Sequence, residues 1–144
     1  MKVEFHSGVA NKLGVACRFL RKAQDAGASV VVCGDRASLD RLDVALWTFD
    51  PLSFVAHVRV KGTEPPTALV PTRTWLVDDA GSVAPRELLL NLGPAMAEGW
   101  EGFARVVEIV SSEPNDANAG RQRWRQYGAR SDLELVHHPR AAGA

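Results

Sequence analysis

A short, uninterrupted apolar run near the start of the chain constrains the fold more than any other stretch. It reads SVVVC, residues 29–33, and three of its five residues are valines. A run this short and this rich in β-branched side chains is typical of a strand that is buried on both faces. Strands of that kind occur in parallel sheets with helices on both sides, so the run indicates an α/β fold.

The segments around this run alternate between strand and helix patterns. We expect one α/β domain over residues 1–144, with a largely parallel central sheet and a frayed tail at 138–144. The proline-bearing stretch 59–72 is expected to be an exposed loop. The expected strands are 2–6, 29–33, 53–58, 74–77, 87–92, 106–110 and 133–136, and the expected helices are 9–26, a segment from a cap at Asp35 to Trp47, and 116–128.

The composition indicates which partners the protein can bind and where in the cell it is located. Lysine plus arginine and aspartate plus glutamate balance at 17 each, whereas a general nucleic-acid binder usually carries a basic excess. No apolar run approaches the roughly 20 residues of a membrane span, and Glu4 and His6 interrupt any signal peptide. We therefore expect a cytoplasmic protein without membrane contact, whose Cys17 and Cys33 are reduced thiols in the core.

Catalytic and cofactor motifs are missing from the sequence. The first strand-to-helix turn, HSGVANKLG, has neither the G-x-G-x-x-G spacing nor a G-K-[ST] ending. The four histidines show no metal-ligand spacing, and Asp78-Asp79 indicates a turn. Asp50, Ser53 and His57 are too close in sequence to form a convincing triad. We expect no active site, no cofactor and no metal.

Two stretches combine aromatic residues with charge. In RLDVALWTFDPLSFVAH, residues 41–57, Trp47 and Phe54 flank a turn and belong either to the core or to a pocket wall. In AGRQRWRQYGAR, residues 119–130, arginines surround Trp124 and Tyr127. Such a helix suits nucleic acid, or an acidic peptide that ends in an apolar side chain and a free carboxylate. The alternative is a solvent-facing basic stripe whose aromatics pack into the core.

Both stretches resemble one family. The string RLDxALW, a short turn and SFVxH, together with RQRWRQY, are similar to the chi subunit of the bacterial DNA polymerase III holoenzyme. The resemblance covers most of the chain. It implies a non-catalytic accessory subunit with a single three-layer Rossmann-like sandwich. It also implies two partners: the psi subunit, which tethers chi to the clamp loader, and the acidic, phenylalanine-terminated tail of single-stranded DNA-binding protein. DNA would then be contacted mainly indirectly.

The resemblance also implies a pocket for that tail. Arg121 would pair with the terminal carboxylate or an acidic side chain, and Trp124 would occupy the position of a family tyrosine. The apolar part of the pocket would be lined by Trp47, Phe54 and Val110.

One position departs from the family pattern. The family carries a lysine one turn before the arginine, and Ala117 stands here instead, so Arg125 or Arg123 is expected to compensate. Two other functions stay open. One is direct binding of single-stranded DNA through Arg121, Arg123, Arg125 and Trp124. The other is a small α/β nucleotide-binding enzyme that uses the carboxyl edge of the sheet.

Overall fold

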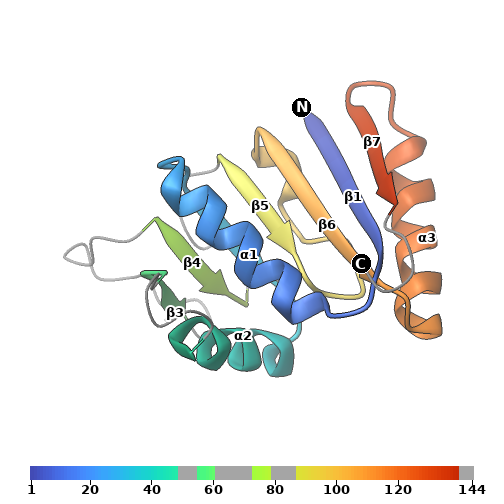
Figure 1. The fold of residues 1–144 in the computed structure, drawn as a ribbon. Helices are drawn as coiled ribbons and strands as arrows, with labels where there is room; N and C mark the ends of the chain where they lie inside the picture. Colours follow the sequence, from blue (N-terminus) through green and yellow to red (C-terminus); the bar gives the residue numbers. More distant parts are fainter. Residues whose placement is uncertain (49–54, 61–72, 79–86, 140–144) are drawn as a thin grey trace.

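The structure, a computed structural model, describes residues 1–48, 55–60, 73–78 and 87–139 (Figure 1). Strands and helices alternate over residues 2–60, as the sequence predicts for the first part of the chain. In chain order the elements are β1 (Lys2–Val9), α1 (Lys12–Asp25), β2 (Val30–Cys33), α2 (Arg36–Thr48), β3 (Val58–Val60), β4 (Thr74–Val77), β5 (Leu88–Asn91), η2 (Trp100–Gly102), β6 (Arg105–Ser111), α3 (Pro114–Gly128) and β7 (Glu134–Pro139).

The strands form one seven-stranded sheet in the order β3-β4-β2-β5-β6-β1-β7. Every strand pairing that the structure describes is parallel. All four residues of β2 are buried, as are those of its neighbours β4 and β5. The short apolar run that opened the sequence argument is therefore an interior strand of a parallel sheet, as its composition predicts.

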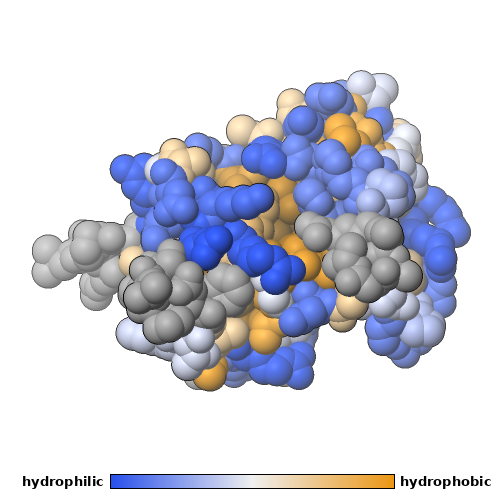
Figure 2. Space-filling view, viewed as in Figure 1, coloured by the Kyte–Doolittle hydropathy of each residue, from blue (hydrophilic) through white to orange (hydrophobic). Residues whose placement is uncertain are grey.

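Helices cover both faces of the sheet, so the fold is a three-layer, Rossmann-like α/β sandwich. Successive residues of β2 point to opposite faces: Val32 belongs to the buried cluster that contains Leu20 of α1 and Leu39 of α2. Its neighbour Val31 belongs to a second cluster that contains Tyr127 of α3. The helices α1 and α2 thus share one face, and α3 covers the other (Figure 1). Figure 2 shows that the outer side of the α1–α2 face is mainly hydrophilic.

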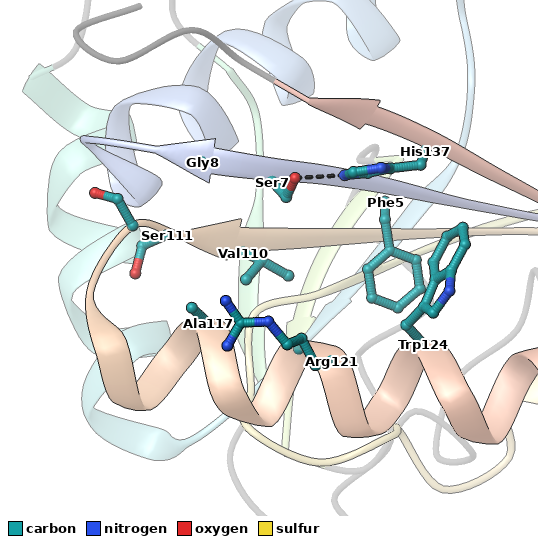
Figure 3. Close-up of a pocket in the computed structure, with 11 residues that line it drawn as sticks. Phe5, Ser7, Gly8, Val110, Ser111, Ala117, Arg121, Trp124 and His137 are labelled. Atoms are coloured by element: carbon teal, nitrogen blue, oxygen red, sulfur yellow. Dashed lines mark hydrogen bonds between the residues drawn. The ribbon is translucent and has the colours of Figure 1, made fainter.

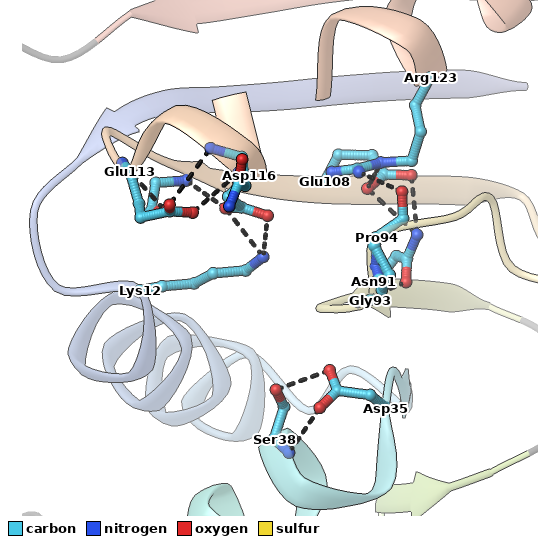
Figure 4. Close-up of polar contacts among 12 residues, drawn as sticks. Lys12, Asp35, Ser38, Asn91, Gly93, Pro94, Glu108, Glu113, Asp116 and Arg123 are labelled. Atoms are coloured by element: carbon cyan, nitrogen blue, oxygen red, sulfur yellow. Dashed lines mark hydrogen bonds and ion pairs between the residues drawn. The ribbon is translucent and has the colours of Figure 1, made fainter. Parts of the chain in front are cut away.

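At the start of each long helix, the side chain of a preceding residue caps the first backbone N–H groups. The Asn11 side chain accepts a hydrogen bond from the backbone N–H of Gly14, and the Asp35 carboxylate accepts from Ser38 (Figure 4). The Glu113 carboxylate accepts from the first amides of α3. These caps use the amides that would otherwise bind a phosphate at a helix N-terminus, which weakens the nucleotide-binding interpretation.

Several strands and helices begin or end at other residues than the sequence predicts. Strand β1 continues to Val9, because it pairs with β6 on one side and β7 on the other, and α1 therefore starts at Lys12. A register shift between His6 and Val9 accompanies Gly8, whose φ of 69° suits a residue without Cβ. Strand β3 occupies 58–60 rather than 53–58. Residues 53–54 and 61–72 lie outside the described residues.

The C-terminal strand is longer than predicted. Fraying was expected from residue 138, but His138 pairs with His6 and Pro139 pairs with Ser7 in the parallel register of β1 and β7. The backbone of β1 stabilises these two residues, a long-range contact that composition does not reveal. Residues 140–144 lie outside the described part of the chain.

A buried polar network fixes α3 on the sheet (Figure 4). The Glu108 carboxylate of β6 accepts hydrogen bonds from Arg123 Nε at 3.0 Å, from the Tyr127 hydroxyl at 2.8 Å and from the Asn91 side-chain amide. Arg123 Nη1 also donates to the Pro94 carbonyl at 2.8 Å. Burial raises the pKa of Glu108, and the neighbouring guanidinium and hydrogen-bond donors oppose that shift without cancelling it. The network therefore fixes which side of α3 faces the sheet.

Candidate functional site

A cavity of about 550 Å³ lies between α3 and the carboxyl ends of β1, β6 and β7 (Figure 3). We call it the α3 pocket. Its volume is within the range of ordinary ligand pockets. The described residues that line it are Phe5, Ser7, Gly8, Val110, Ser111, Ser112, Ala117, Gly120, Arg121, Trp124 and His137.

The topology explains why a pocket forms at this place. Strands β1 and β6 are neighbours, but the chain leaves β1 over one face through α1 and leaves β6 over the other face through α3. At such a switch point the two connections diverge and open a crevice at the carboxyl ends of the strands. The α3 pocket is therefore a product of the fold itself.

The apolar part of the pocket joins α3 to β1 and β6. The Trp124 indole is 36% exposed and meets the Phe5 ring edge to face, with ring centroids 5.3 Å apart. Helix α3 approaches β6 closely at Gly120, where an added Cβ would lie 2.7 Å from Val110 Cγ1. The pocket thus offers an aromatic wall that is half open to solvent, which suits a flat apolar ligand group.

The polar part of the pocket carries positive charge. Arg121 Nη1 donates to the Asn118 side chain at 2.7 Å, which orients the guanidinium and leaves its other N–H groups for a ligand. On the opposite wall the His137 ring lies 2.5 Å from the Ser7 hydroxyl (Figure 3). None of the described lining residues is acidic. Chemically, the pocket suits an anion that carries an apolar group.

The structure brings three of the predicted site residues together. Val110, Arg121 and Trp124 all line the α3 pocket. Tyr127 is fully buried, so one aromatic of the C-terminal helix belongs to the core and the other to the pocket. Arg125 lies on α3 but does not line the pocket.

The prediction that Arg123 supplies the positive charge that Ala117 lacks is wrong. The Arg123 side chain is 2% exposed and is held by Glu108, so it faces the core rather than a ligand. Ala117 does line the α3 pocket, where a lysine would have extended the positive wall. Within the described lining, Arg121 is therefore the permanently charged group of the pocket.

The structure places Trp47 elsewhere. It lies at the end of α2, a helix on the face opposite α3, so the predicted grouping with Arg121 is wrong. Its ring is 64% exposed and contacts the His57 ring at 5.7 Å. His57 lies 2.7 Å from the Asp43 carboxylate of α2. Phe54, Asp50 and Ser53 lie outside the described residues.

Sequence reasoning missed the part of the pocket that β1 and β7 provide. His137 follows Ser7 by 130 positions in the sequence, and only the parallel register of β1 and β7 brings it beside Phe5 and Ser7. On the other face of the sheet, the same register brings side-chain atoms of Glu4, His6 and His138 that could ligate a metal ion within 4.8 Å of one another. The spacing of the histidines gave no sign of this cluster. Its carboxylate is already held by Arg105 at 2.6 Å.

Comparison with known proteins decides the family. A sequence model of the family described as DNA polymerase III chi subunit, HolC, matches residues 1–133. The chain belongs to this family. The DNA polymerase III subunit chi of Pseudomonas aeruginosa is 35% identical over 118 residues, which cover 81% of this chain and 78% of that relative. The chi subunit of Escherichia coli is 27% identical over 114 residues, 78% of this chain and 76% of its own. The predicted family is thus confirmed.

A solved structure supports the fold of this chi-family chain. The C-terminal domain of the DEAD-box protein Dbp5 superposes with a TM-score of 0.62 and covers 96% of the chain and 90% of its own length. The two sequences are 10% identical, so the likeness concerns the α/β fold alone. Among the described residues, no helix is long and apolar enough to cross a bilayer.

Proposed function

We propose that this chi-family chain is a non-catalytic subunit that binds the acidic, phenylalanine-terminated tail of single-stranded DNA-binding protein in the α3 pocket. One observation carries the proposal: an apolar cavity with an aromatic wall is bordered by Arg121, and its described lining contains no acid. A C-terminal phenylalanine supplies both groups that such a cavity favours, a ring and a carboxylate. The preceding acidic residues of the tail suit the same positive border.

The expected affinity follows from these two contacts. Burial of one phenylalanine side chain contributes about 1.5–3 kcal/mol. A hydrogen bond between the Arg121 guanidinium and a carboxylate contributes at most about 1.5–3 kcal/mol, and less where water screens it. Association costs offset part of this gain, so we expect a dissociation constant on the order of micromolar. Such a contact exchanges quickly, which suits a subunit that must follow a moving template.

A peptide titration tests the proposal directly. We expect a fluorescein-labelled acidic peptide with a free C-terminal phenylalanine to bind saturably, as measured by fluorescence anisotropy. Removal of that phenylalanine should weaken binding at least about tenfold, because both the ring and its carboxylate are displaced. Equal binding of the shortened peptide would contradict the pocket assignment. Steeply salt-dependent binding of an oligothymidine without any peptide binding would favour the direct DNA function instead.

A second surface suits the psi subunit. Val44 and Trp47 are three residues apart on α2, so they share one side of the helix, and their side chains are 67% and 64% exposed. Tryptophan is enriched among the residues that dominate protein interfaces. The two residues lie on the face opposite the α3 pocket, so psi and the tail would bind together without competing.

Paired variants test this division of surfaces. Trp47→Ala is expected to weaken binding of the purified psi subunit at least about tenfold in isothermal calorimetry, because truncation empties the centre of the contact. The same variant should bind the tail peptide normally. Arg121→Ala should show the reverse pattern. Loss of both partners in either variant would mean that the two sites are not independent.

A further inference from the structure

The wall of the α3 pocket opposite Arg121 contains a histidine that the family resemblance did not predict. His137 lies on β7 and lines the pocket, while Arg121 reaches it from α3 (Figure 3). A ligand in the cavity therefore lies between a guanidinium and an imidazole. Both side chains are anchored to neighbours in the pocket region, so they are partly pre-organised for such a ligand.

Contacts from two elements hold the His137 ring in place. Its Nε2 lies 2.5 Å from the Ser7 hydroxyl of β1, and its ring centroid lies 5.6 Å from that of Trp124. With Nε2 engaged by the hydroxyl, Nδ1 is the ring nitrogen left for a ligand. The neighbouring His138 points to the other face of the sheet and stacks on His6, with ring centroids 4.8 Å apart. It therefore provides a matched control one position away.

The charges around His137 favour an anionic ligand. The groups around it are the Ser7 hydroxyl of β1, the Trp124 ring of α3, and the Arg121 guanidinium, which lines the opposite wall of the pocket from α3. No carboxylate is present among the described residues of the lining. Among the described lining residues, a bound carboxylate would therefore meet donor groups and no like charge.

We propose that His137 is the second anion contact of the α3 pocket, so that the pocket binds two carboxylates of an acidic tail at once. This inference rests on the proposed function, because it uses the same ligand. The His137 imidazole and the Arg121 guanidinium lie on two walls of the same cavity, so each can hold one carboxylate of the tail.

The experiment compares the affinities of three proteins for the tail peptide. We expect His137→Ala to bind the peptide about two- to fivefold more weakly than the unaltered protein, the range of an exposed charged contact. His138→Ala should bind the peptide like the unaltered protein. The inference is overturned if His137→Ala binds as tightly as the unaltered protein or if both variants lose the same affinity.

A second readout separates this inference from the proposed function. If the tail peptide fails to bind, the proposed function is wrong, and N-acetylphenylalanine then serves as the probe. We expect its carboxylate to shift the imidazole nitrogen resonances of His137, and not those of His138, in long-range ¹⁵N–¹H spectra at pH 6.0. Absence of any shift at His137 during this titration would overturn the inference.

Discussion

Replacement of Arg123 by methionine is expected to destabilise the protein by about 3–5 kcal/mol, the usual cost of breaking a buried ion pair. The Glu108 carboxylate would lose its 3.0 Å contact with Arg123 Nε while remaining fully buried. The hydrogen bonds from Tyr127 and Asn91 would remain, but neither carries a positive charge. The free energy of unfolding can be measured by urea denaturation followed by circular dichroism.

Arg125→Met provides the matched control, since it makes the same substitution two residues away on the exposed side of α3. It should change the free energy of unfolding by less than about 0.5 kcal/mol. A double variant, Arg123→Met with Glu108→Gln, should recover part of the loss because no buried charge remains. Equal destabilisation by the two methionine variants would mean that the buried arginine contributes no more to the free energy of unfolding than an exposed one.

The effect of Arg123→Met should also depend on pH. Burial already raises the pKa of Glu108 above its usual 4.5, and removal of the guanidinium raises it further. A carboxyl with a raised pKa binds its proton more tightly in the folded state, so it favours folding at acid pH and this contribution is lost as pH rises. The stability deficit of the variant should therefore be smaller near pH 4.5 than at pH 7. A deficit that is independent of pH would contradict this account of Glu108.

Arg121→Ala is expected to weaken binding of the tail peptide about tenfold, because the cavity loses its permanently charged border. Arg125→Ala removes the same charge from the same helix one turn later, and should change the affinity less than about twofold. Both arginines are exposed on α3, so neither variant should alter the thermal midpoint appreciably. Anisotropy titrations at two salt concentrations would measure the effect. Equal losses would indicate general charge attraction rather than recognition in the pocket.

The sequence predicts local structure well where a short segment contains its own signal. The run TWLV at 74–77 is a strand with the predicted bounds, because a threonine and three apolar residues between polar sequences leave few alternatives. The C-terminal helix also ends where Gly128 was expected to end it. Its arginines and aromatics included Arg121 and Trp124, which line the pocket from α3.

The wall of the pocket that β1 and β7 provide depends on long-range strand register, which no local pattern encodes. His137 reaches the pocket because β7 pairs with β1, and that pairing aligns it with Phe5 rather than with a neighbour in sequence. Trp47 was misplaced for a related reason. Amphipathic spacing shows that α2 buries one side, but it does not tell which face of the sheet receives it.

The position of β7 at the rim of the sheet has a consequence for how this pocket can diversify. The strand has one neighbour, β1, and most of its side chains are exposed or half-buried. It also lies beyond residue 133, where the match to the family ends. Leu135 packs against the buried cluster on the α3 face, whereas the exposed positions of β7 do not belong to that cluster. We therefore expect substitutions at the exposed β7 positions to change the ligand preference of the cavity with little effect on folding.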